Sequence, residues 1–245
     1  MAQAQNVLWI IQQAMTELGL DKPVTALSSG ENTVQQFVSL LNSAGQEMVL
    51  GYPWEQLTKE WVFTTTANQD EYDLPADWSY LLDQTQWDRT NHWPLLGPKT
   101  AQEWQWLKGG LLSSGPRLRY RLRGGKFIVF PKPTSATTPW NLGMEYVADT
   151  WLEDGSTSGI YYSAITNDTD ISLLDPWVLV KFIKLKFRQA KGLDATSFSQ
   201  DFVSIWETRI GKNKGAPVLT LAPRPRTLLI GINNIPDGSW NVGSP

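Results

Sequence analysis

Apolar residues recur with helical spacing at both ends of the chain, whereas the middle of the chain alternates. Within residues 5–18, Val7, Ile11 and Met15 fall on one stripe of a 3.6-residue period. Gly19 follows that stripe, and glycine is the usual residue just past the end of a helix. The pattern predicts a first amphipathic helix that ends just before this glycine.

A second helix is predicted after the polar loop that follows. Ser28 and Glu31 have the S-x-x-E spacing of a capping box. Apolar residues with helical spacing then continue to Leu50. Two short amphipathic helices this close in sequence are expected to pack as an antiparallel pair.

The helical period returns in the last third of the chain. Asp175 is a favourable N-cap, and Pro176 suits the first helical position. This third helix is predicted to stop at Gly192, and Asp194 is placed to cap a fourth. The residues of the fourth helix expected to face inward are Phe198, Phe202, Ile205 and Trp206.

Between the helices the residues favour strands. The β-branched and aromatic run 61–66, with stretches 80–88 and 140–148, predicts three strands. Thr100 and Glu103 have the spacing to cap one short helix. With the hairpin described next, the middle of the chain is predicted to hold about five or six strands.

The clearest local pattern is RLRYRLRGGKFIVF, at residues 117–130. Two adjacent glycines separate two strand-forming runs, which predicts a β-hairpin with a tight two-residue turn. Apolar residues alternate with arginines before the turn, so one face of the first strand is predicted to be apolar. The other face, called the arginine face below, carries Arg117, Arg119, Arg121 and Arg123.

These elements predict an α+β fold. The N- and C-terminal helices form one helical bundle, and an antiparallel β-domain is inserted between them. The predicted units are a bundle of residues 1–58 and 172–214, a β-rich insert of residues 59–171, and an extended C-terminal arm of residues 215–245. A flexible break is expected at residues 155–159, with the sequence GSTSG.

The arm combines five prolines and four glycines with many apolar residues. Proline and glycine exclude a long helix, and disordered tails are poor in apolar residues. An extended apolar segment needs a surface to lie on, so the arm is predicted to contact a partner. The predicted contact residues are Pro217, Leu219, Leu221, Arg224, Arg226, Leu228, Leu229, Ile230 and Trp240.

Composition narrows the function classes. The net charge of −3 argues against a dedicated nucleic-acid binder, which is usually strongly basic. Without cysteine there are no disulfides and no thiolate metal sites, which suits synthesis in a reducing cytoplasm. No run approaches the roughly 18 apolar residues of a membrane span. The 13 tryptophans are unusual, and they suit either a thin β-core or an interface.

The sequence contains no recognisable catalytic motif. The single histidine, His92, provides no metal cluster, and no nucleophile elbow or phosphate-binding glycine motif is present. The acidic groups at 70–73 and 153–154 lie in predicted turns, where acidic residues are common. We therefore predict no enzyme activity, no catalytic residues, no metal site and no cofactor.

The order of elements resembles the head-to-tail adaptor family of short-tailed bacteriophages, also called connector, gatekeeper or tail tubular protein A-like proteins. In that family a helix precedes an aromatic strand and a Y-x-LP-x-D segment. The last two helices also resemble the helical half of the family. The residues that carry the strand and segment motifs here are Trp61, Phe63, Thr64, Tyr72, Leu74, Pro75 and Asp77.

The resemblance implies a structural virion protein at the head–tail junction. Family members form a ring of twelve copies below the portal protein, extend the DNA channel, and provide the platform for the tail nozzle protein. Several also help to seat tail fibres. DNA passes through the ring without specific binding, and the C-terminal segment contacts the portal or a neighbouring copy. A ring of this kind uses a head-to-tail interface that closes by rotation.

Two other functions remain open at this stage. The tryptophans allow a carbohydrate-binding tail module, which requires exposed, coplanar rings. A DNA-binding packaging accessory requires exposed cations. The arginine face, and the basic side of the third helix, are read in three ways: a solvated surface, an interface with an acidic neighbour, or contact with DNA. The residues of that basic side are Lys181, Lys184, Lys186, Arg188 and Lys191.

Overall fold

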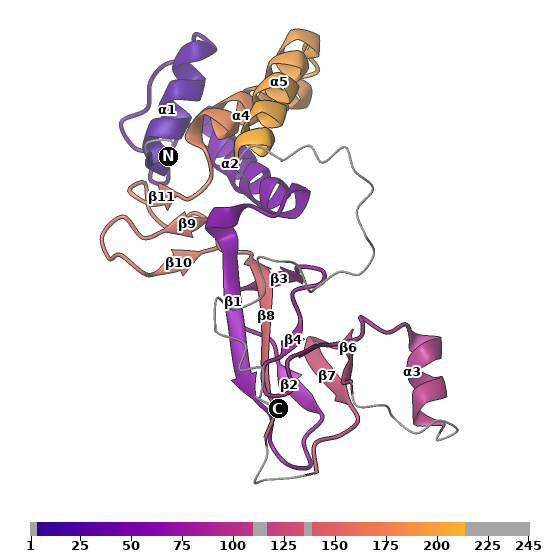
Figure 1. Cartoon of the computed structure of the whole chain (residues 1–245). Helices are drawn as coiled ribbons and strands as arrows, with labels where there is room; N and C mark the ends of the chain where they lie inside the picture. Colours follow the sequence, from indigo (N-terminus) through magenta and orange to yellow (C-terminus); the bar gives the residue numbers. More distant parts are fainter. Residues whose placement is uncertain (1–3, 110–116, 135–138, 214–245) are drawn as a thin grey trace, which may run out of the picture.

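A computed structural model describes residues 4–109, 117–134 and 139–213, and it has an α+β fold. Four of its helices gather at one end of the molecule, and two sheets lie at the other end (Figure 1). A third, small sheet lies between them, beside the base of the helices. The predicted mixture of helices and antiparallel strands is therefore confirmed.

The four grouped helices are those predicted near the chain ends. Among them α4 is central, because it packs against each of the other three, whereas α1 and α2 touch each other less. The expected antiparallel pair is thus a minor contact. The helices are α1 (Val7–Glu17), α2 (Asn32–Gly51), α4 (Pro176–Ala190) and α5 (Thr196–Asn213).

The predicted ends of α1 and α4 are confirmed. Gly19 and Gly192 follow these helices with φ of 72° and 67°, which L side chains rarely adopt. The Asp175 side chain accepts hydrogen bonds from the backbone N–H groups of Trp177 and Val178. The chain therefore begins α4 with a cap and a proline, as the sequence indicates.

The capping box predicted for α2 is wrong. The helix begins at Asn32, with Glu31 at the N-cap and no side-chain cap. The loop before it is held differently, because the Gln35 side chain donates hydrogen bonds to loop carbonyls. This glutamine fixes the loop through its carbonyls, and it leaves the first N–H groups of α2 without a side-chain cap.

Two sheets form the far end of the molecule. In the first, β1 pairs with β8, β8 also pairs with β3 and β4, and β5 pairs with β4. In the second, β7 lies between β2 and β6. The strands of the first sheet are β1 (Thr58–Thr64), β3 (Trp78–Leu81), β4 (Trp87–Asp88), β5 (Trp93–Pro94) and β8 (Asn141–Ala148). Those of the second are β2 (Glu71–Asp73), β6 (Arg119–Arg123) and β7 (Lys126–Phe130).

The two sheets pack face to face on an aromatic core. The Phe63 ring lies 4.7 Å from that of Tyr72 and 6.0 Å from that of Phe127, centroid to centroid. Trp61 and Met144 join the same cluster. Because side chains alternate along a strand, the neighbours of these residues point away from the core on both sheets.

The hairpin prediction is confirmed, and one strand prediction is wrong. Arg123 pairs directly with Lys126, and Gly124 and Gly125 both have positive φ, as a two-residue hairpin turn requires. The stretch 80–88, expected as one strand, is divided between β3 and β4. Gln84, with φ of 65°, turns the chain between them.

A small helix covers part of the second sheet. Helix α3 (Ala101–Lys108) has the predicted capping box between Thr100 and Glu103. Its buried Trp104 and Leu107 pack on Ile128 of β7. The short 3-10 helix at Glu55–Leu57 leads from α2 into β1.

The third sheet was not expected from the sequence. It consists of β9 (Leu152–Glu153), β10 (Tyr161–Tyr162) and β11 (Ile171–Ser172). The loop 155–159, where a flexible break was expected, connects β9 to β10 within this sheet. The carboxylates of Glu153 and Asp154 accept hydrogen bonds from four loop residues.

The helices and the sheets share one core through Trp151. This indole is completely buried and packs with Leu152 in the main hydrophobic cluster of the helices. Its Nε1 donates to the Ser163 carbonyl at 2.9 Å. A β-carbon built on Gly45 of α2 would lie 2.2 Å from the indole ring, so only glycine allows this approach.

The predicted arm, residues 215–245, lies outside the described residues. The contact residues from Pro217 to Trp240 therefore stay predictions. The division into a four-helix bundle and an inserted β-domain likewise stays a prediction.

Candidate functional site

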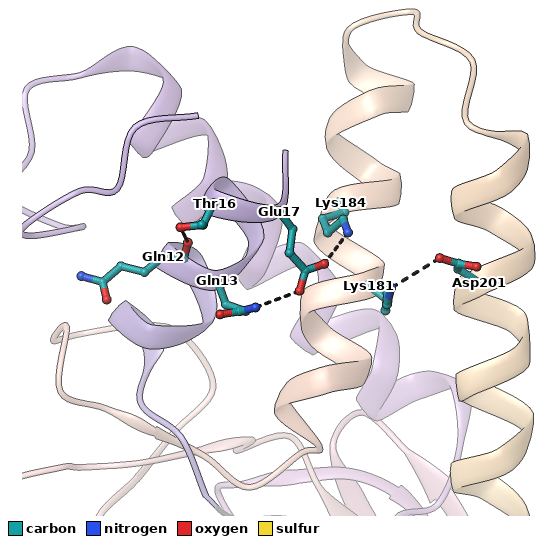
Figure 2. A network of polar contacts seen from close by, with 7 residues as sticks. All are labelled: Gln12, Gln13, Thr16, Glu17, Lys181, Lys184 and Asp201. Carbon is teal, nitrogen blue, oxygen red and sulfur yellow. Dashed lines mark hydrogen bonds and ion pairs between the residues drawn. The ribbon is translucent and has the colours of Figure 1, made fainter. Parts of the chain in front are cut away.

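The basic side of α4 is used inside the molecule. Figure 2 shows Lys184 beside Glu17 of α1, and Lys181 beside Asp201 of α5. Lys181 and Asp201 are 3.4 Å apart, and Lys186 lies 2.6 Å from Glu47 of α2. Each lysine thus connects α4 to a different helix.

Lys184 is the most buried of these lysines, with a side chain only 8% exposed. Burial would raise the pKa of Glu17. Hydrogen bonds from Lys184 and Gln13, together with the charges of Lys184 and Lys181, outweigh burial, so the pKa of Glu17 is lowered. The Glu17 carboxylate is therefore held in its charged form against the buried ammonium.

Arg188 of α4 and Lys191, the residue that follows the helix, pack on aromatic rings. The Arg188 guanidinium lies 4.7 Å from the centre of the Phe198 ring, and Lys191 lies 5.4 Å from that of Phe187. Cations over ring faces are attracted by the ring quadrupole. None of the three readings included the ion pairs that Lys181, Lys184 and Lys186 make within the same chain.

The arginine face is different, because most of it has no internal partner. In the register of β6 and β7, Arg119 lies opposite Phe130 and Arg121 opposite Ile128, so these arginines point away from the aromatic core. Arg123 pairs with Glu71 of β2. Arg117, Arg119 and Arg121 make no ion pair within the described part of the chain, and Nη1 of Arg119 is buried without a hydrogen-bond partner.

The outward face of the first sheet carries the opposite charge. Glu60 of β1 lies directly across from Glu145 of β8, and both are exposed. Arg89 pairs with Glu60 and crosses the strand at Gly143, where a β-carbon would lie 2.4 Å from the guanidinium. These residues line an open hollow of about 610 Å³, which also includes His92. We call this surface the glutamate face.

The acidic groups that were considered for catalysis have structural roles. Glu71 and Asp73 form ion pairs with Arg123 and Lys126. Glu153 and Asp154 hold the loop of the third sheet. No group of three or more His, Cys, Asp or Glu side chains is placed to bind a metal ion within residues 4–109, 117–134 and 139–213.

Two of the residues that carry the family resemblance, Asp77 and Tyr72, stabilise the fold. Asp77 lies 2.6 Å from Nζ of Lys59 and accepts a hydrogen bond from the Tyr146 hydroxyl at 2.9 Å. Burial would raise the pKa of Asp77, but these contacts lower it. Burial and the neighbouring carboxylate raise the pKa of Tyr146. Tyr72 lies in the aromatic core, so the motif marks residues that build the sheets.

The tryptophans do not form a flat binding platform in the described residues. Trp54, Trp104 and Trp151 are buried. The exposed ones lie in three separate elements, and no ring contact joins any two of them. They are Trp93 of β5, Trp106 of α3 and Trp177 of α4. This arrangement gives no support to a carbohydrate-binding module.

Each helix in the described part of the chain is too short or too polar to cross a lipid bilayer.

The sequence matches a family model described as SU10 adaptor protein over residues 5–209. No curated protein matches the chain. The matched range includes all the described helices and sheets except the last turn of α5, and it ends before the predicted arm.

Proposed function

Because the chain belongs to the SU10 adaptor protein family, we propose that it is the ring-forming adaptor between the portal and the tail nozzle of a short-tailed bacteriophage. The family is one of phage structural proteins that act at the head–tail junction, and it is not an enzyme family. A structural adaptor has its place in the virion. The match over residues 5–209 is the observation that carries the proposal.

The finer features come from the family resemblance and suit the residues present. By that resemblance we expect twelve copies, and a head-to-tail interface forms a closed ring when the rotation per copy divides a full turn. The ring extends the DNA channel and supports the nozzle protein, and tail fibres attach there in some family members. The helices at one end of each copy would lie side by side in the ring wall.

The charge arrangement of α4 suits a channel through which DNA moves without specific binding. A wall that attracts phosphates strongly would hold the DNA. The lysines of α4 face Glu17, Glu47 and Asp201 instead of free solution. We therefore propose that α4 does not present a continuous basic surface to the channel.

The arm is proposed to bind the portal protein. It begins directly after α5, and it carries Leu228, Leu229 and Ile230 as a compact apolar group. Trp240 provides a large aromatic anchor, and Arg224 is a charged contact of the kind that dominates interface energies. An extended segment also adds main-chain hydrogen bonds to its partner.

Truncation tests this role of the arm. A chain that ends at Gly215 should fold normally but fail to join purified portal rings, whereas the full chain should join them. Sedimentation of the portal with each chain measures the difference. A triple change of Leu228, Leu229 and Ile230 to serine should weaken binding at least about tenfold, since a combined loss of about 1.4 kcal/mol from the three apolar anchors is sufficient for that factor.

A matched control replaces Asn233 and Asn234 with serine, which changes the arm without removing an apolar anchor. This control should bind the portal as the full chain does. Equal binding by the truncated and full chains would contradict the proposed role of the arm. Failure of the full chain to bind any portal ring would contradict the adaptor proposal itself.

A further inference from the structure

The two packed sheets carry opposite charges on opposite outer surfaces. Their aromatic core lies between them, so residues that alternate with core residues point to the two outsides. On one outside lies the arginine face of β6, which α3 partly covers where it packs on Ile128 and Phe130. On the other lies the glutamate face of β1 and β8. A side chain on one of these faces cannot neutralise a charge on the other within the same copy.

The arginine face has positive charge in excess. Of its four arginines only Arg123 has an acidic partner among the described residues. Arg121 is half-buried beside Ile128, and Arg117 is exposed. The buried Nη1 of Arg119 has no acceptor among the described residues, and an unpaired buried donor costs free energy unless a partner supplies an acceptor.

The glutamate face has the complementary excess. Glu60 and Glu145 are cross-strand neighbours, and like charges in that position repel each other. Arg89 pairs with Glu60 but leaves Glu145 without an ion pair in the described structure. The hollow beside them is open to solvent and is large enough to receive long side chains from another molecule.

A head-to-tail ring needs this combination. Every copy in such a ring presents two different surfaces, and each surface meets the other kind on the next copy. Complementary charges across an interface fix its register and exclude wrong pairings. A self-complementary two-fold dimer would instead bring arginine to arginine at its centre.

We propose that the arginine face of one copy docks on the glutamate face of the next copy, with Arg121 and its neighbours entering the hollow beside Glu145. The proposal rests on the ring described under Proposed function, and it names the surfaces that form its β-sheet contacts. A second copy of this chain is favoured over DNA as the occupant. The chain is acidic overall, and the complementary acidic surface is built into the same fold.

Charge reversal at the two faces tests the pairing. Arg121→Glu puts a glutamate on the arginine face, so that a glutamate would meet Glu145 of the next copy, and Glu145→Arg puts an arginine opposite Arg121. Each variant alone should raise the concentration needed for ring assembly at least about tenfold. Lys22→Glu, an exposed cation on the loop after α1, is the control and should leave assembly unchanged.

The sharpest measurement mixes the two variants. Rings that alternate Arg121→Glu copies with Glu145→Arg copies have opposite charges at every interface. The equimolar mixture should therefore assemble, although neither variant does so alone. The double variant in one chain should also assemble, because it exchanges the two charges of the proposed contact and keeps them opposite. Ring assembly is measured by native mass with portal present, and circular dichroism checks that each variant folds.

The outcomes separate the interface from the adaptor proposal. If both single variants form rings as readily as wild type, the proposed interface is wrong and the adaptor role is unaffected. Wild-type chain that forms no ring overturns both. If the mixture fails to assemble, the two faces do not meet. If Arg121→Glu loses salt-dependent binding of duplex DNA while its rings form normally, the arginine face contacts DNA and the interface is wrong.

Discussion

Replacing Gly45 with alanine is expected to destabilise the protein by about 3 kcal/mol, although alanine is the better helix former. The new methyl group would lie 2.2 Å from the indole of Trp151. That indole has no room to retreat, because it is fully buried and its Nε1 is bonded to Ser163. Either α2 or the segment between β8 and β9 at residue 151 must shift, and both belong to the core shared by helices and sheets.

Thermal unfolding followed by circular dichroism measures this effect. For a chain of this size, about 3 kcal/mol corresponds to a Tm lower by roughly 6–12 °C. Gly211→Ala in α5 is the matched control, because no atom of the described residues lies within 4 Å of the added methyl group. The control should raise the stability by about 0.5–1 kcal/mol through helix propensity alone. A Gly45→Ala protein as stable as the control would show that the close approach is not essential.

Replacing Glu17 with glutamine is expected to destabilise the protein by about 2 kcal/mol. The change leaves the ammonium of Lys184 buried without its counter-charge, and breaking one side of a buried pair is costly. The value is set below the full cost of a buried pair because the Glu17 side chain is 26% exposed. Urea unfolding at pH 7 gives the difference.

Glu47→Gln is the control for this pair. Glu47 contacts Lys186 with a side chain 51% exposed, and exposed pairs contribute at most about 1 kcal/mol. The control should therefore unfold close to wild type. If Glu17→Gln and Glu47→Gln lowered the free energy of unfolding equally, the burial of Lys184 would not make its ion pair more important than the exposed one.

The same pair predicts a pH dependence. The pKa of Glu17 is lowered in the folded protein from its ordinary value of 4.5. Its contribution is therefore complete above pH 4.5 and is lost as the pH falls through the lowered value. The stability difference between wild type and Glu17→Gln should shrink as the pH falls below 4.5. A difference that stays constant to pH 2 would contradict the assigned charge of Glu17.

Local signals in the sequence were sufficient for features that one segment determines alone. The hairpin at Gly124–Gly125, the cap at Asp175 and the stop at Gly192 need only neighbouring residues, and all three are confirmed. The start of α2 was wrong because Gln35, one turn inside the helix, holds the preceding loop. A motif at the helix start could not reveal that bond.

Features assembled from distant segments could not be predicted in this way. The third sheet uses strands of two residues, which are too short for any periodicity. The lysines of α4 read as an open basic surface because Glu17, Glu47 and Asp201 come from three other helices. The alternation in β6 did indicate the arginine face. The glutamate face was missed because Glu60 and Glu145 meet only when β1 pairs with β8.

The central claim is that this chain forms a ring on the portal, and the native mass of the portal complex tests it most directly. Portal rings mixed with an excess of the full chain should give one complex, whose added mass is a fixed multiple of the 27.6 kDa chain. By the family resemblance that multiple is twelve. A portal that gains no mass, or gains a variable number of copies without saturation, would contradict the account.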